Sequence, residues 1–157
     1  MPVSNSPIFP QLIRTPGVSI APGDTTTRKS LLAGGANGTR VDAISIASTD
    51  TASRDVALWL YDGSTHRLLT TVTVPASSGN NNATPAIDVL RSTQIPGLPY
   101  DAAGNRILYV ASGCTLEVSC TSTVTTACTI DEDPSASAMS LTKQRSIFNV
   151  SMGKRVK

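Results

Sequence analysis

Apolar and polar positions follow a strand-like pattern most clearly between residues 54 and 75. Two runs rich in β-branched and aromatic residues, RDVALWLY and HRLLTTVTV, suit a pleated surface that faces a core. Asp62-Gly63 separates the runs, and Asp-Gly in this position is a strong hairpin signal because Gly accepts the positive φ of a tight turn. The pattern predicts a β-hairpin near the centre of a sheet, with Trp59, the single Trp of the chain, as an anchor in the core.

Shorter runs on both sides of this hairpin predict further strands. Pro, Gly and polar clusters separate the runs, as expected for strands joined by turns. Residues 76–85 are small and polar and predict an exposed loop, whereas residues 86–91 fit either a helical turn or a strand, with Pro85 favouring the helical turn. The other predicted strands are 17–22, 29–33, 39–48, 106–111, 114–120 and 123–130, the last two paired as a hairpin.

The number of strands and the composition together predict the fold class. The chain of 157 residues contains 10 Pro and 11 Gly, and only 15% of its residues are charged, which does not suggest a disordered protein. Eight or nine short strands and little helix predict an all-β fold, a single β-sandwich of jelly-roll or Ig-like type. We expect an extended N-terminal arm (1–16), a β-sandwich domain (17–133) and a C-terminal tail (134–157).

The N-terminal arm combines Pro with large apolar side chains. Four Pro residues within residues 1–16 prevent regular structure. The apolar side chains between them need a cover, which is either the protein's own domain or a neighbouring subunit. We predict that the arm makes an intermolecular contact. Its apolar residues are Ile8, Phe9, Leu12 and Ile13.

Charge and hydropathy argue against two classes of partner. The formal net charge is only +2, so we expect no nucleic-acid partner, although the last five residues are locally basic. No apolar run approaches the roughly 20 residues that span a bilayer, so we expect no membrane partner. The N-terminus lacks the charged start and apolar centre of a signal peptide, so synthesis in a cytoplasm is expected.

The sequence contains no recognisable catalytic or metal-binding motif. His66 is the single His and has no nucleophile or acid at a known catalytic spacing. The acidic run 131–133 lacks the alternating ligands and the Gly of a calcium loop. The Gly-rich stretch 34–38 precedes a strand and lacks the Lys-Ser/Thr of a phosphate loop. We therefore expect a protein that is not an enzyme and that needs no cofactor or metal.

The three cysteines allow several arrangements. Cys114 and Cys120 are six residues apart, about 20 Å in a straight strand, which is too far for a disulfide. Cys128 would face Cys120 across a turn near residues 122–123, and a bond there would leave Cys114 for an intermolecular bond. The alternative is that all three are buried thiols that act as small apolar residues.

Four segments in a fixed order resemble a family of small virion proteins of tailed bacteriophages. They are a Gly-rich turn followed by Arg-Val-Asp-Ala-Ile (33–44), Leu-Trp-Leu-Tyr-Asp-Gly (58–63), Val-Pro-Ala-Ser-Ser-Gly (74–79) and Ile-Pro-Gly-Leu-Pro (95–99). The resemblance covers residues 15–130 and contains no catalytic motif. It implies a structural protein of the virion, assembled in the host cytoplasm, that decorates or cements the capsid or belongs to the neck, collar or tail.

The same resemblance implies the partners. They are the major capsid protein or other virion proteins, together with further copies of the chain in a homo-oligomer such as a trimer. A carbohydrate-binding module is the main alternative from another class, because sandwiches of this size often bind glycans through exposed aromatic side chains. Aromatic residues make up only 4% of this chain, and the expected burial of Trp59 also counts against that alternative.

Overall fold

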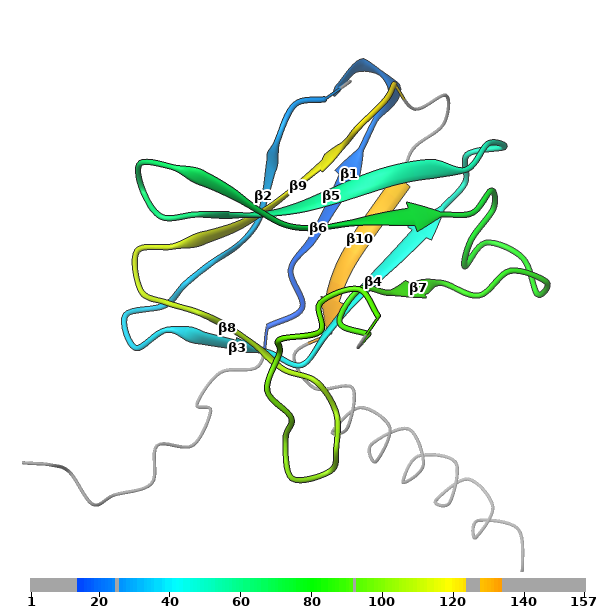
Figure 1. The fold of residues 1–157 in the computed structure, drawn as a ribbon. Helices are drawn as coiled ribbons and strands as arrows, with labels where there is room; N and C mark the ends of the chain where they lie inside the picture. The colour runs from blue at the N-terminus through cyan, green and yellow to red at the C-terminus, as the bar shows by residue number, and fades with distance from the viewer. Residues whose placement is uncertain (1–13, 25, 92, 124–127, 134–157) are drawn as a thin grey trace, which may run out of the picture.

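The protein is mostly β-structure, arranged in antiparallel sheets (Figure 1). The structure is a computed structural model that describes residues 14–24, 26–91, 93–123 and 128–133, with Ile130 as the one described side chain of the last range. Within these ranges there are ten strands and one short 3-10 helix, η1 (Pro22–Asp24), but no α-helix. The predicted all-β class is confirmed at this level. None of the described residues forms a helix long and apolar enough to cross a membrane.

Eight strands form two four-stranded sheets, and the other two form a ribbon. In their spatial order across the sheet, the strands of the β4 sheet are β1 (Gly17–Ile20), β10 (Cys128–Asp133), β4 (Ala43–Ser48) and β7 (Ile87–Asp88). The β5 sheet contains β2 (Lys29–Ala33), β9 (Thr115–Cys120), β5 (Arg54–Tyr61) and β6 (His66–Val74). The ribbon pairs β3 (Thr39–Val41) with β8 (Leu108–Val110).

Both sheets and the ribbon contribute to one hydrophobic core. In β4 the alternation places Ile44 and Ile46 in this core, and in β5 it places Val56 and Leu58 there. Leu58 is 1% exposed, so its whole side chain is removed from water. The burial of one face of each strand explains why period-2 patterning was informative in these segments.

The hairpin prediction for residues 54–75 is confirmed, but its position in the sheet is only partly as expected. Gly63 has a φ of 93° in the turn between β5 and β6, a conformation that few residues other than Gly adopt. Strand β5 lies between β9 and β6 in the interior of its sheet, whereas β6 is an edge strand. Only the first arm of the hairpin is therefore central.

The predicted hairpin between residues 114–120 and 123–130 is wrong. Strand β9 lies between β2 and β5, whereas β10 lies between β1 and β4 in the other sheet. In the register, Cys120 pairs with Val56 and Cys128 pairs with Ser48. The connection between β9 and β10 thus passes from one sheet to the other, which short-range sequence signals do not distinguish from a hairpin turn.

The predicted strand 39–48 is two strands that belong to different partners. Strand β3 pairs with β8, whereas β4, which begins after Asp42, pairs with β10 and β7. Val41 is buried on odd parity, and Ile44 and Ile46 are buried on even parity, so the inward face changes at Asp42. The sequence contained this signal, because apolar residues of this segment occupy both parities.

Two predictions for residues 76–91 need correction. The segment 86–91 contains the two-residue strand β7 and no helical turn. Ile87 and Asp88 of this strand pair with β4. The loop before it is exposed at most positions but is anchored at Ser78, which is completely buried. The carbonyl of Ser78 accepts a hydrogen bond from Ser48 N at 2.7 Å, and its hydroxyl donates to Pro85 O at 2.6 Å.

Candidate functional site

The predicted contact residues of the arm are not among the described residues. Ile8, Phe9, Leu12 and Ile13 precede Arg14, where the description begins. Their intermolecular contact stays a prediction. What the structure does provide is the place on the domain from which the arm extends.

Two of the three cysteines have described side chains, and both carry free thiols. Cys120 is 1% exposed, and its Sγ lies 3.4 Å from the backbone oxygen of Asp55. Cys114 is half-buried and packs against the edge of the core. The side chain of Cys128 is outside the described residues, so the predicted disulfide arrangements remain predictions.

His66 and Glu117 lie together on the outer face of the β5 sheet. Nδ1 of His66 is 2.8 Å from Oε2 of Glu117, and the imidazole stacks on the ring of Tyr61 with centroids 4.4 Å apart. The ring stack joins the neighbouring strands β5 and β6, and the His66–Glu117 contact reaches across β5 from β6 to β9, so both contacts have a structural explanation. No group of three or more His, Cys, Asp or Glu side chains that could hold a metal occurs among the described residues.

Trp59 is not a core anchor, contrary to the prediction. It belongs to the parity opposite to Leu58 and lies half-buried on the outer face of the β5 sheet. The indole Nε1 donates to Ser119 Oγ at 3.0 Å, and the guanidinium of Arg28 lies 4.4 Å from the ring centroid. A cation over an aromatic face is favourable, and here it also covers part of the ring surface. Both parities of β5 are apolar, so the alternation alone did not reveal which face was inward.

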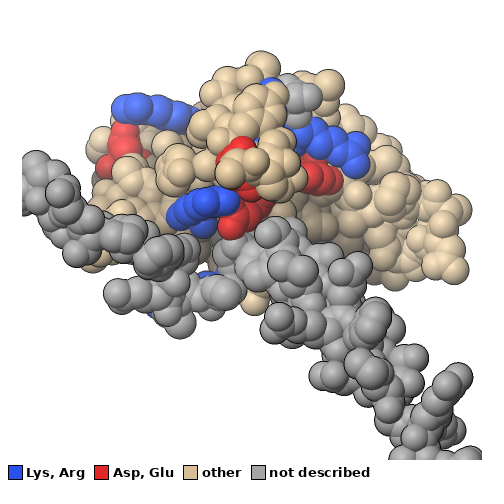
Figure 2. Space-filling view, turned by 90° about the horizontal axis from the view of Figure 1, so that it is seen from below, with Lys and Arg blue, Asp and Glu red and all other residues tan. Residues whose placement is uncertain are grey.

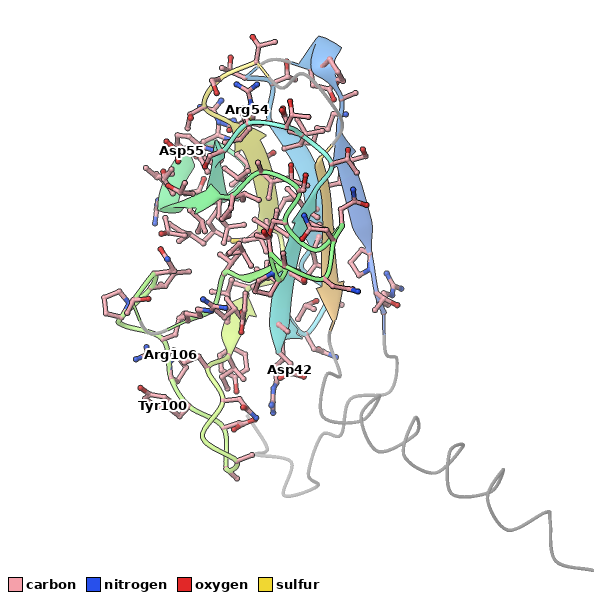
Figure 3. All side chains as sticks on the ribbon, turned by 90° about the vertical axis from the view of Figure 1, so that its right-hand side faces the viewer. Asp42, Arg54, Asp55, Tyr100 and Arg106 are labelled. Atoms are coloured by element: carbon pink, nitrogen blue, oxygen red, sulfur yellow. The ribbon has the colours of Figure 1, made fainter. Side chains whose placement is uncertain are left out.

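A different group of residues gathers near the β3–β8 ribbon, which lies at the lower end of the molecule in Figure 1. We call this group, whose members are given below, the tyrosine–arginine end. Two of its members, Tyr100 and Tyr109, are each 60% exposed. Figure 3 shows Asp42, Tyr100 and Arg106 at this end and Arg54 and Asp55 at the opposite end. The group consists of Arg40, Asp42, Tyr100, Asp101, Arg106 and Tyr109.

Arg106 organises the loop at this end. Its Nη1 donates to the carbonyls of Ile95, Pro96 and Leu98 at 3.2, 2.8 and 3.2 Å. Its Nη2 donates to the hydroxyl of Tyr100 at 2.7 Å, and the guanidinium lies 4.5 Å from the Tyr100 ring centroid. Backbone carbonyls in an irregular loop need such donors, because they have no strand partner. Arg106 therefore fixes both the loop and the position of Tyr100.

Asp101 connects this loop to the ribbon. Its Oδ1 accepts hydrogen bonds from the backbone N–H groups of Asn105 and Ala103 at 2.7 and 2.9 Å. Its Oδ2 lies 3.6 Å from Nη2 of Arg40, which pairs across the ribbon with Tyr109. The hydrogen bond from Asn105 is the main cause that lowers the pKa of Asp101 below its ordinary value. The carboxylate thus links the loop that follows Tyr100 to the ribbon that carries Tyr109.

The sequence analysis missed this group. Its members come from β3 and the residue that follows it, from β8 and from the loop between β7 and β8, and only the pairing of β3 with β8 brings them together. The available signal was the pair of Tyr residues on either side of Gly104-Asn105, where the structure has a turn. An exposed aromatic side chain next to a turn was not distinguishable from a buried one without knowledge of that pairing.

The described β-domain starts and finishes at the same end of the β4 sheet. Gly17, at the start of β1, pairs with Asp131, and Asp133, at the end of β10, pairs with Ala43. Ala43 directly follows Asp42 of the tyrosine–arginine end. The chain therefore enters and leaves the described domain at this end.

Comparison with protein-family models, curated proteins and solved structures found no match.

Proposed function

We propose that this chain is a non-enzymatic structural protein of a bacteriophage particle, which decorates or cements the capsid through contacts between subunits. The proposal rests on the order of segments that resembles small virion proteins of tailed phages. It also includes the finer fold assignment, a β-sandwich of jelly-roll or Ig-like type. Two four-stranded antiparallel sheets that share one core support that assignment.

The observation that carries the proposal is the position of the domain's two ends. Because β1 begins and β10 ends at the same end of the β4 sheet, the chain enters and leaves the described domain at one end. A particle-bound protein can use extensions from one end to increase its contact area without a larger domain. The four apolar residues of the arm fit that use.

The decisive experiment is quantitative mass spectrometry of purified particles. A decoration or cement protein should be present in a copy number comparable with that of the major capsid protein. A copy number of about a dozen or fewer would indicate a neck, collar or tail component instead, which is the alternative within the same class. Absence of the protein from particles that contain all other virion proteins would reject both assignments.

The carbohydrate-binding alternative needs a separate argument, because Trp59 is not in the core. Its ring is nevertheless partly covered by Arg28, and Tyr61 stacks on His66, so both aromatic faces already have partners. Glycan sites present free aromatic faces together with converging polar groups. A glycan-binding screen of the wild type and of a Trp59→Ala, Tyr61→Ala variant tests this alternative, which requires binding that the variant loses.

A further inference from the structure

The tyrosine–arginine end has the composition of a protein interface. Only three large apolar or aromatic side chains are strongly exposed among the described residues, and two of them, Tyr100 and Tyr109, belong to this end. The third is Leu68 on β6. Tyr and Arg are enriched among the residues that dominate binding energy at interfaces, because they combine large contact area with hydrogen-bonding capacity.

The two tyrosines are presented to solvent in different ways. The side chain of Tyr100 is held by the hydrogen bond and ring contact with Arg106, which itself binds three backbone carbonyls. The backbone of Tyr109 is held in β8, between the buried residues Leu108 and Val110, so its side chain points outward. A side chain that is already ordered loses less conformational entropy on binding. Tyr100 is thus suited to act as a rigid anchor, and Tyr109 adds a second exposed ring.

The charges of this end balance one another. Two arginines and two aspartates occur in the group, and Arg40 contacts both Asp42, at 2.5 Å, and Asp101. Figure 2, which views the molecule from below, shows basic and acidic side chains intermingled on this face. A polyanion such as nucleic acid requires an excess of basic groups. A folded protein surface without strong net charge fits this face better.

The place where the described chain starts and ends indicates which partner would bind the tyrosine–arginine end. Residues 1–13 precede this end, and residues 134–157 follow it. If residues 1–13 contact the particle, as the proposed function holds, the end of the domain that they adjoin in sequence is the surface they bring to the particle most directly. We propose that the tyrosine–arginine end binds the protein shell of the particle, with Tyr100 and Tyr109 as its aromatic anchors. This inference rests on the proposed function and names its contact surface.

The test uses the full chain and particles from infections in which the protein is not made. Binding of purified protein to these particles is measured by co-sedimentation over a concentration series. The Tyr100→Ala, Tyr109→Ala double variant should bind at least about tenfold more weakly, because truncation of an anchor residue has a large effect. Leu68→Ala is the matched control, since it removes an exposed apolar side chain from another surface and should bind like the wild type.

Folding of the variants is checked by circular dichroism and thermal melting. If the double variant does not fold, Tyr109→Ala alone replaces it, because Tyr109 is exposed and its side chain makes no hydrogen bond among the described residues. The Tyr100→Phe, Tyr109→Phe variant keeps both aromatic rings and should retain most of the binding. Equal binding by the wild type and the folded alanine variants would overturn the inference and leave the proposed function intact.

Three other outcomes would also overturn the inference. Wild-type protein that is absent from native particles and does not bind the deficient ones would reject the proposed function together with it. Unchanged particle binding by a variant that no longer self-associates would assign this end to contacts between copies of the chain. Unchanged particle binding by a variant that loses capture on neutral polysaccharide beads would assign it to a glycan.

Discussion

Arg54 donates a hydrogen bond from Nε to Oδ2 of Asp50 at 3.0 Å, although the Asp50 side chain is completely buried. The other carboxylate oxygen accepts from the backbone N–H of Ala52 at 3.0 Å. The backbone oxygen of Asp50 also accepts from Ser77 N at 2.9 Å, so this residue connects the β4–β5 turn to the loop after β6. A buried carboxylate is stable only when it is paired and hydrogen-bonded, as it is here.

Replacement of Asp50 should therefore destabilise the domain. Asp50→Ala should lower the free energy of unfolding by about 3 kcal/mol, because it removes a buried carboxylate that pairs with a mostly buried guanidinium and accepts from a backbone N–H. Asp42→Ala is the control, since the Arg40–Asp42 pair is exposed and should contribute less than about 1 kcal/mol. Urea unfolding measures both values. Equal effects of the two substitutions would show that the burial of Asp50 does not increase its contribution to the free energy of unfolding.

Leu58 and Leu68 provide a matched comparison within one hairpin. Leu58→Ala should lower the free energy of unfolding by about 2–5 kcal/mol, because its side chain is 1% exposed within the core. The same substitution at Leu68, which is 52% exposed, should change it by less than about 0.5 kcal/mol. A small effect at Leu58 would place its parity on the outer face, contrary to the structure.

Asp62 should make stability depend on acidic pH. Hydrogen bonds from the backbone of Thr65 and then of Ser64 are the main causes that lower its pKa from 3.8 to about 2. The unfolded chain therefore binds this proton at a higher pH than the folded chain does. The resulting stability is fully present above about pH 4 and is lost as the pH falls towards 2.

The melting temperature between pH 5 and pH 2 tests this dependence. Asp62→Asn keeps an oxygen that can accept the turn hydrogen bonds but removes the titrating group, so its melting temperature should fall less steeply than that of the wild type. Asp62→Ala removes the acceptor as well and should melt at a lower temperature at neutral pH. Superimposable profiles for the wild type and Asp62→Asn would contradict the assignment.

The N-terminal arm should matter for assembly and not for folding. Deletion of residues 1–13 leaves β1 intact, so the melting temperature should stay near that of the wild type, while incorporation into particles should fall. Replacement of Ile8, Phe9, Leu12 and Ile13 by Ser, with every Pro kept, should reproduce the loss if apolar contact is its cause. Incorporation at the wild-type level by both variants would refute an intermolecular role for the arm.

The oxidation state of the thiols in intact particles should show whether the cysteines form an intermolecular disulfide after assembly or remain buried and unpaired. A phage protein is made in a reducing cytoplasm and meets an oxidising exterior after lysis, so a disulfide would form after assembly. Cys114 is half-buried and Cys120 is buried, so Cys114 is the more accessible of the two. Intact particles, alkylated before denaturation and run without reductant, should give covalent oligomers that Cys114→Ser abolishes and Cys120→Ser retains. A monomer band with three alkylated thiols would mean that all three cysteines are unpaired.

Local signals in the sequence were sufficient for the individual strands and turns. Strand β2 has the predicted bounds, and the Asp62-Gly63 turn joins β5 to β6 as expected. These features depend on the conformational freedom of Gly and on the alternation of side chains along a strand, both of which act within a few residues. The break at Asp42 was visible in the same way, as apolar residues on both parities.

The tertiary structure alone decided which strands are neighbours and which face of β5 is inward. Strands β9 and β10 are close in sequence but lie in different sheets, because their pairing partners come from distant parts of the chain. Trp59 lies outside the core because the opposite parity of β5, with Leu58, faces the core that both sheets share. The tyrosine–arginine end exists because β3 pairs with β8, a contact between residues about 70 positions apart in the register Arg40 to Tyr109. Such contacts depend on how whole faces fit together, which no short segment of sequence encodes.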